Sequence, residues 1–185
     1  PICGTVLPYL LKLIAPAKPL SLQVHPSREQ AERRYEDEDS AGVAITDPNR
    51  NYFDRNHKPE LLLALTKFEA VAGFRAPRRV ADVVSGLDCT IAETLLGFLK
   101  EDLSPVGIRR CFEYLLSNET KPSPEAVGDL VEGCRARLDA GTSPSMRADR
   151  IAIHLADHYP GDPGVVASLL LNPVTLQPGE ALFVP

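Results

Sequence analysis

The sequence predicts an α+β protein in which a helical segment interrupts a β-rich part of the chain. Two observations support this prediction. Short apolar runs typical of strands occur before residue 75 and again after residue 173, whereas the apolar positions between residues 77 and 158 repeat with the helical period. The composition, 44% hydrophobic and 24% charged, is that of a globular chain rather than a disordered one.

The first strand-forming segments precede Pro26. Residues 5–14 (TVLPYLLKLI) form an apolar run that Pro8 interrupts, which favours a strand over a helix. Residues 19–25 (PLSLQVH) alternate with a period of two, so that successive side chains leave from opposite faces of a strand. One face carries Leu20, Leu22 and Val24, and the other carries Ser21, Gln23 and His25.

A helix is expected directly after this strand. Ser27 and Gln30 have the spacing of a capping box, which marks a helix N-terminus. The acidic run of residues 36–39 (EDED) is expected to be a solvated surface turn, because it lacks the spacing of a calcium-binding loop.

The next segment is expected to be a loop followed by two strands. Residues 46–59 are rich in Asn, Asp and Pro, which is typical of a loop. Residues 60–66 and 68–74 are short apolar runs, and we expect them to pair as a hairpin through Thr66 and Lys67.

The middle of the chain is expected to be a helical insertion. Pairs of Ser followed by Pro, at residues 104–105 and 123–124, have the form of an N-cap followed by the first helical position. The expected helices are residues 77–86, 105–117, 123–139 and 146–158. A short helix from residue 162 to 170 and strands at 174–177 and 181–184, joined by a turn at Pro178 and Gly179, then return the chain to β structure.

Composition excludes several classes of protein. The net charge is −5 and no basic stripe is visible, which argues against a nucleic-acid partner. No apolar segment reaches the roughly 20 residues that a membrane span needs, and no signal peptide is visible. The four cysteines, Cys3, Cys89, Cys111 and Cys134, are widely spaced and predict reduced thiols in a cytoplasmic protein. Because residue 1 is Pro and the sole methionine is Met146, we expect a fragment of a longer protein.

The sharpest candidate site is a metal site formed by Gln23, His25 and Glu60. Gln23 and His25 leave the same face of a strand, and Glu60 opens a later strand. A mixed nitrogen and oxygen set without thiolate suits a catalytic zinc with one open position, and it also suits Fe(II), Mn(II) or Ni(II). The alternative is a structural histidine that binds no metal.

Other histidines and two lysines compete for functional roles. His154 and His158 have helical i,i+4 spacing, but the acid of a His-Glu-x-x-His motif is absent, and we expect surface histidines. His57 is expected to be a loop residue that binds no metal. Lys12 and Lys58 are surface lysines unless they lie near the metal, where either could hold a phosphate or transfer a proton.

Four segments together resemble the type I phosphomannose isomerase family. They are residues 7–12 (LPYLLK), 19–26 (PLSLQVHP), 51–60 (NYFDRNHKPE) and 68–75 (FEAVAGFR). Residues 176–185 (LQPGEALFVP) are similar to the family's strand that leads to a Pro-Ala-Gly-x-x-His motif.

The resemblance implies a cupin-like β-barrel (jelly roll) with an inserted all-helical domain. Residues 1–76 would be the first part of the cupin catalytic domain, and residues 77–166 would form the helical insertion. Residues 167–185 would be return strands of the cupin catalytic domain, which is truncated there. In such a barrel Ser21, Gln23 and His25 would face the cavity, while the apolar side chains of the same strand would pack outward under a covering layer.

The resemblance also implies an activity and its residues. The family interconverts mannose 6-phosphate and fructose 6-phosphate with one zinc ion per chain. Gln23, His25 and Glu60 match zinc ligands, Lys58 matches a lysine near the reacting carbons, and Lys12 and Ser21 match positions near the substrate. The fourth zinc ligand is expected beyond Pro185, so this fragment alone is expected to be inactive.

Two other functions remain open at this stage. One is a different metal-dependent cupin enzyme, such as an oxygenase, and the other is a non-catalytic cupin that binds sugar phosphates. In each case the expected partner is a small molecule rather than nucleic acid or membrane. The sequence does not fix the oligomeric state, and a monomer is expected.

Overall fold

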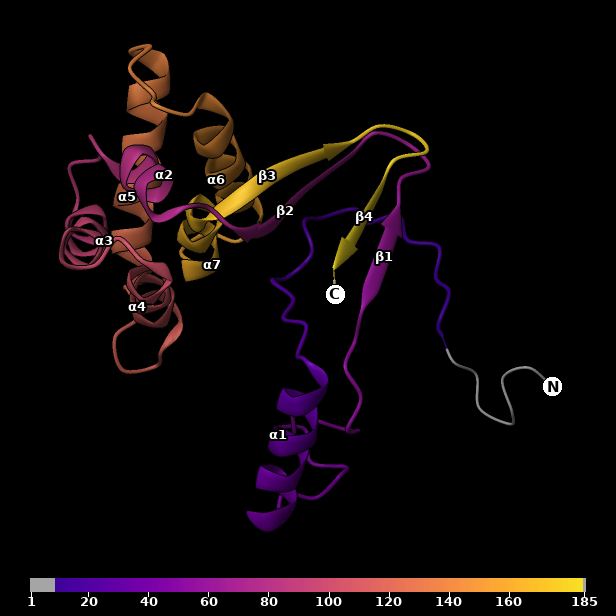
Figure 1. The fold of residues 1–185 in the computed structure, drawn as a ribbon. Helices are drawn as coiled ribbons and strands as arrows, with labels where there is room; N and C mark the ends of the chain where they lie inside the picture. Colours follow the sequence, from indigo (N-terminus) through magenta and orange to yellow (C-terminus); the bar gives the residue numbers. More distant parts are fainter. Residues whose placement is uncertain (1–8, 185) are drawn as a thin grey trace.

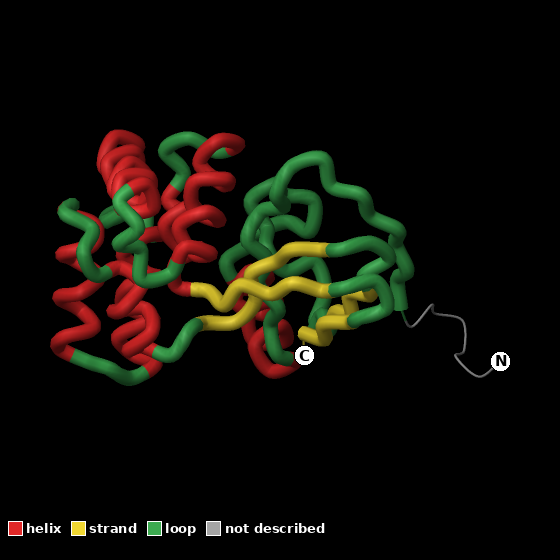
Figure 2. Tube along the Cα trace, turned by 90° about the horizontal axis from the view of Figure 1, so that it is seen from above, coloured by secondary structure: helices red, strands yellow, loops and turns green. Residues whose placement is uncertain are grey.

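The computed structural model describes residues 9–184. A helical unit lies at one side of the molecule, and a long ribbon of strands leads away from it (Figure 1). Seen from above, the yellow strands run out of the red helices toward the segment that carries the N-terminus (Figure 2). The helices of this unit are α2 Pro77–Val84, α3 Thr90–Glu101, α4 Pro105–Leu116, α5 Pro124–Asp139, α6 Met146–His158 and α7 Pro163–Ala167, which a short 3₁₀ turn, Ser168–Leu170, follows.

The helical unit has its own apolar core. Its buried side chains run from Val80 on α2 to Leu170 in the 3₁₀ turn and come from every helix between them. Cys111 and Cys134 lie in this core, and burial raises the pKa of the first thiol to about 11 and of the second to about 12. These two cysteines therefore behave as small apolar residues, as expected.

Local signals explain most of the helix boundaries. The hydroxyls of Ser104 and Ser123 accept hydrogen bonds from the backbone N–H groups of Val106 and Ala126, so both expected N-caps are confirmed. Helix α3 was not expected from the sequence. Its N-cap residue, Cys89, makes no side-chain cap hydrogen bond and no Pro follows it, so a start signal is absent.

A buried ion pair joins three of the helices. Arg137 on α5 donates from Nε to Asp149 Oδ2 on α6 at 2.7 Å, and a second bond runs from its Nη2 to Oδ1. Arg137 also donates to the carbonyl oxygens of Val83 and Ser85 at the end of α2. Ser143 donates its hydroxyl to Asp149, whose side chain is fully buried. The pair is thus satisfied on both sides, which a buried charge requires.

The strands do not form the expected hairpin. β1 Glu60–Leu63 pairs antiparallel with β4 Ala181–Val184, and β2 Phe68–Phe74 pairs antiparallel with β3 Leu171–Leu176. The chain reverses instead through the helical unit between β2 and β3, and Gly179, with a φ of 89°, lies at the bend between β3 and β4. Thr66 and Lys67 are not residues that favour a tight reversing turn, and β1 and β2 follow one another along one side of a two-stranded ribbon that bends between them, with β3 and β4 along the other side (Figure 1).

The segment before α1 is not a strand. Residues 9–27 contain no helix or strand, so the expected strand at 19–25 is wrong, and so is the described part of the expected strand at 5–14. Residues 5–8 lie outside the described residues. Leu20, Leu22 and Val24 are exposed, so their alternation does not mark a buried face in this structure. Within the described residues no neighbouring strand supplies the hydrogen-bond ladder that this segment would need.

Helix α1 Arg28–Ser40 confirms the expected helix after Pro26. The Ser27 hydroxyl accepts a hydrogen bond from the N–H of Gln30 at 3.2 Å. The acidic run 36–39 is not a surface turn, because it forms the last turn of this helix. Two of its carboxylates, Glu38 and Asp39, pair with groups of the loop that follows.

The fold is therefore α+β with small antiparallel sheets. The described residues form two two-stranded sheets, and no closed barrel is found among them. None of the helices described is both long and apolar enough to cross a membrane.

Candidate functional site

His25 and Glu60 meet although they lie far apart in the chain. His25 Nε2 lies 3.3 Å from Glu60 Oε2. The other ring nitrogen, Nδ1, lies 2.7 Å from the backbone carbonyl oxygen of Lys58. The histidine side chain is 17% exposed and the glutamate 59%, so the pair lies at the surface with the imidazole partly buried.

The contact with Lys58 fixes the chemistry of the imidazole. A carbonyl oxygen only accepts hydrogen bonds, so Nδ1 must carry a proton and donate it. Nε2 then faces the Glu60 carboxylate either as an N–H group or as a free lone pair. A charge-assisted N–H to carboxylate bond is usually about 2.7–2.9 Å long. The observed 3.3 Å is longer than that range but still within contact distance, so the two atoms face each other at the surface.

The spacing of these two atoms fits zinc. Ligands at zinc bond lengths of about 2.0–2.1 Å, arranged tetrahedrally, lie about 3.3–3.4 Å from one another. His25 Nε2 and Glu60 Oε2 are 3.3 Å apart. An Nδ1–H group that donates to a backbone carbonyl is also the usual outer-shell contact of a metal-bound histidine, because it holds the ring in the tautomer with a free Nε2.

Gln23 and Ser21 form a local hydrogen-bonded unit on the same segment. The Gln23 side-chain amide donates to the Ser21 hydroxyl at 2.8 Å and to the Ser21 carbonyl oxygen at 3.2 Å. These bonds use the NH₂ end of the amide and leave Oε1, the atom that binds metals, without a partner inside this unit. Ser21 thus orients Gln23, a role that the sequence pattern does not reveal.

The two lysines occupy different positions. Lys58 lies two residues before Glu60, its side chain is exposed, and its backbone carbonyl holds His25. Lys12 is exposed in the extended segment that precedes Pro19. The structure therefore brings His25, Lys58 and Glu60 together and leaves Lys12 at the surface. The role of the Lys58 carbonyl could not be read from the sequence, since any residue type supplies a carbonyl.

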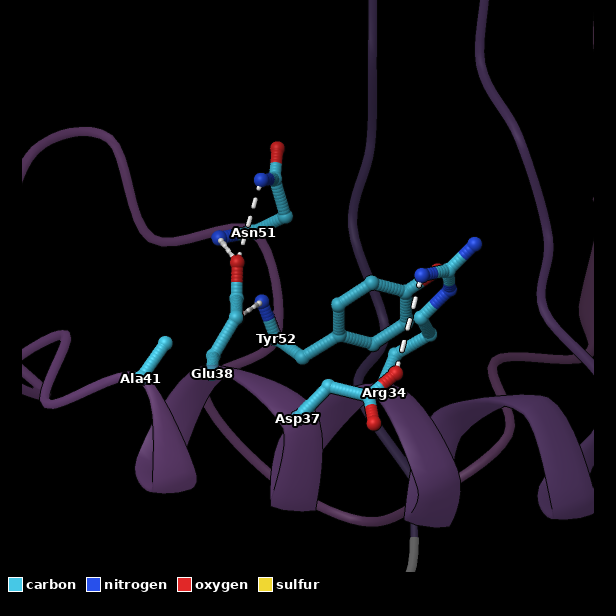
Figure 3. Close-up of a pocket in the computed structure, with 6 residues that line it drawn as sticks. All are labelled: Arg34, Asp37, Glu38, Ala41, Asn51 and Tyr52. Carbon is cyan, nitrogen blue, oxygen red and sulfur yellow. Dashed lines mark hydrogen bonds and ion pairs between the residues drawn. The ribbon is translucent and has the colours of Figure 1, made fainter.

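The loop that presents Lys58 and Glu60 is anchored to α1. Glu38 accepts hydrogen bonds from the backbone N–H groups of Asn51 and Tyr52, both at 2.9 Å, and from the Asn51 side chain at 3.1 Å (Figure 3). The Asn51 backbone bond is the main cause that lowers the pKa of Glu38 below its ordinary value. Arg50 is almost fully buried and donates to the carbonyl oxygens of Val43 and Tyr52.

An open pocket of about 260 Å³ lies beside this anchor (Figure 3). Its walls include Glu38, Asn51 and Tyr52, together with the Arg34–Asp37 ion pair at 3.6 Å. None of the predicted site residues lines it. The pocket is therefore a feature of the loop anchor and not of the candidate metal site.

The other histidines do not join this site. His57 Nδ1 lies 3.3 Å from Arg28 Nη2. His154 and His158 stack edge to face on α6 with ring centres 5.0 Å apart. Across residues 9–184, no group of three or more His, Cys, Asp or Glu residues gathers around a point that a metal could occupy. A zinc site in this part of the chain would consist of His25, Glu60 and an amide such as that of Gln23. Gln is not one of the four residue types that define these groups.

Comparisons with known proteins agree with the sequence resemblance. Residues 2–77 match the family model of the phosphomannose isomerase type I catalytic domain. The mannose-6-phosphate isomerase of Escherichia coli is 36% identical over 180 residues, and the human protein of the same name is 32% identical over 186 residues. Each alignment covers 96% of this chain but 43% and 42%, respectively, of the relative. The chain thus spans less than half the length of these relatives.

Solved structures give the same result. A mannose 6-phosphate isomerase from Salmonella typhimurium, bound to its substrate fructose 6-phosphate and to zinc, matches with a TM-score of 0.71 and 31% identity. A zinc-bound mannose 6-phosphate isomerase matches with a TM-score of 0.70, also at 31% identity. Both matches cover 91% of this chain and 41% of the solved chain. Fold and sequence agree over the same residues: the chain is similar over most of its length to mannose-6-phosphate isomerases, and residues 2–77 match the type I phosphomannose isomerase catalytic domain.

Proposed function

We propose that the protein containing this chain is a zinc-dependent aldose–ketose isomerase that interconverts mannose 6-phosphate and fructose 6-phosphate. The observation that carries the proposal is the His25–Glu60 pair, whose 3.3 Å spacing and Lys58-held tautomer suit a zinc ion. The names of the relatives and the zinc and substrate in the Salmonella structure support the same reaction.

In this proposal three side chains hold the metal. His25 supplies Nε2, Glu60 supplies a carboxylate oxygen, and Gln23 supplies its amide oxygen, with a fourth protein ligand expected beyond Pro185. Such a zinc ion supplies Lewis acidity, which stabilises negative charge on a substrate oxygen. Lys58 fixes the His25 ring through its carbonyl, and Ser21 orients the Gln23 amide.

The remaining chemistry of the isomerisation is proton transfer between C1 and C2. The exposed Lys58 ammonium, next to the Glu60 strand, is the group of this chain that we assign to proton transfer near the reacting carbons. Lys12, Ser21 or both contact the distant part of the sugar phosphate, where a cation and a hydroxyl suit a phosphate group.

The proposal extends to the architecture and location of the whole protein. Residues 1–76 and 167–185 belong to a cupin barrel, and residues 77–166 are its helical insertion; the separate core of the helical unit, which extends to Leu170, supports an insertion of this kind. The free thiols of Cys89, Cys111 and Cys134 suit a cytoplasmic protein. The expected partner is a sugar phosphate, and a monomer remains the expected state.

A coupled isomerase assay on the full-length protein tests the function. Mannose 6-phosphate is supplied, and turnover is measured before chelation, after chelation and after zinc is added back. We expect turnover that chelation abolishes and zinc restores. Sugar-phosphate binding without turnover would favour a non-catalytic cupin, and turnover restored only by Fe(II) with oxygen would favour an oxygenase.

A further inference from the structure

The segment that carries Gln23 has few contacts with the rest of the molecule. Residues 9–24 contain no helix or strand, and every one of them is exposed except Pro19, which is partly buried. A segment of this kind samples many conformations unless specific contacts restrict it. The contacts that restrict it therefore decide where the Gln23 amide is presented.

One such contact comes from the residue that follows helix α6 in the helical unit. The hydroxyl of Tyr159 donates a hydrogen bond to the carbonyl oxygen of Pro19 at 2.6 Å, across 140 positions of sequence. Tyr159 is 38% exposed and is not among the residues of the helical core.

Tyr159 is itself held rigidly. Its backbone N–H donates to the Leu155 carbonyl at the end of α6, and its carbonyl accepts from the Asp162 N–H. Asp162 caps α7, whose Val165 and Val166 are buried in the helical core. The backbone of Tyr159 is thus held by the helical unit, and its hydroxyl makes one hydrogen bond to the extended segment of residues 9–24.

Two ties bracket Gln23. Tyr159 holds the carbonyl of Pro19 four residues before it, and the Lys58 carbonyl holds His25 two residues after it. Proline fixes its own φ, so holding the Pro19 carbonyl also restricts the direction in which the chain continues. We propose that Tyr159 is a positioning residue of the metal site, which acts through Pro19 to present Gln23 beside His25 and Glu60. The inference rests on the proposed zinc site.

The test replaces the hydroxyl in the full-length, zinc-binding protein. Tyr159→Phe removes one hydrogen bond and keeps the ring, so zinc affinity, measured by competition with a chromophoric chelator, should weaken about two- to tenfold. The melting temperature should stay unchanged, because the lost bond lies outside the helical core. Tyr114→Phe is the matched control, since the Tyr114 ring packs against Phe98 within the helical unit, and its zinc affinity should equal that of the wild type.

A second variant separates positioning from a general effect. If Tyr159 acts through Gln23, Tyr159→Phe should change zinc affinity little in a Gln23→Ala background, where the ligand is already lost. Zinc affinity equal to the wild type in Tyr159→Phe, or full additivity in the double variant, would overturn the inference. A wild type that binds zinc but does not isomerise mannose 6-phosphate would overturn the proposed function, while the positioning role would still be judged on zinc affinity alone.

Discussion

At the scale of single residues, the site depends on one histidine whose two ring nitrogens have different partners. Nδ1 donates to the Lys58 carbonyl, and Nε2 faces Glu60. The first contact sets the tautomer, and in the proposed zinc site Glu60 would supply the adjacent oxygen ligand. Since the first contact uses backbone, substitution of the Lys58 side chain separates holding the metal from proton transfer.

His25→Ala in the full-length protein should abolish zinc binding and turnover. Loss of a direct ligand should weaken zinc affinity by more than the roughly 10- to 100-fold that is typical when an outer-shell partner is lost. The measurement is zinc stoichiometry after gel filtration. His154→Ala is the control and should retain full zinc. Retained zinc in His25→Ala, or lost zinc in His154→Ala, would show that the wrong histidine was assigned.

Lys58→Ala should keep zinc and lower turnover by roughly 100-fold or more, the range of general acid–base catalysis. Zinc binding should persist because the backbone carbonyl that holds His25 is also present when residue 58 is alanine. Steady-state kinetics together with metal analysis provide the check. Lys67→Ala, which removes an exposed lysine paired with Glu69 at 3.0 Å, should leave both quantities unchanged. Unchanged turnover in Lys58→Ala would remove this lysine from the mechanism.

At the scale of elements, the last turn of α1 organises the loop that leads to Lys58 and Glu60. Glu38 accepts two backbone N–H groups from this loop, and Arg50 pairs with Asp39 at 2.8 Å. The acidic run is therefore a loop anchor within a helix. Composition alone does not distinguish this use of a charged run from a solvated surface.

The anchor predicts a specific dependence on pH. Hydrogen bonds from Asn51 and Tyr52 lower the pKa of Glu38 relative to the unfolded value of about 4.3. The stabilisation is therefore complete above that value and is lost as pH falls through the lower folded pKa. The amide proton shifts of Asn51 and Tyr52, followed by NMR, should titrate with a midpoint below about 4.3. In Glu38→Gln this titration should disappear, and its persistence would contradict the anchor.

Within the helical unit, Asp149→Ala should destabilise the protein by about 3–5 kcal/mol, because it leaves the buried Arg137 charge unpaired. Urea unfolding of the full-length protein measures this change. Asp82→Ala, which breaks the exposed Arg79–Asp82 pair, is the control and should cost less than about 1 kcal/mol. Similar losses in both variants would argue against a structural role for the buried pair.

The elements also show which features the sequence could predict. Helices α4 and α5 begin at Ser-Pro pairs, and β4 follows a Pro-Gly turn, so local signals located them. The partner of β1 could not be found in this way, because strand pairing depends on contacts between segments far apart in the chain. The expected strand at 19–25 had the correct alternation, but alternation describes side-chain faces and not the presence of a hydrogen-bonding neighbour.

At the scale of the whole molecule, the helical unit and the part that carries the candidate site are distinct, and the β ribbon leads from one to the other. The helical unit has a continuous core, whereas Gln23, His25 and Glu60 lie outside it on the extended segment and on β1. The sequence predicts these three side chains as metal ligands, and its resemblance to type I phosphomannose isomerases agrees with the comparisons. It does not reveal the contact of the Lys58 carbonyl with His25 or that of the Tyr159 hydroxyl with the Pro19 carbonyl, since each joins a side chain to backbone far away in the sequence.

A zinc-edge anomalous crystal structure of the full-length, zinc-loaded protein tests the proposed metal site most directly. We predict one zinc ion about 2.0–2.2 Å from both His25 Nε2 and a Glu60 carboxylate oxygen. We also predict that His25 Nδ1 still donates to the Lys58 carbonyl. Zinc bound at His154 and His158 instead, or a direct His25–Glu60 hydrogen bond in the zinc-loaded protein, would contradict the proposed site.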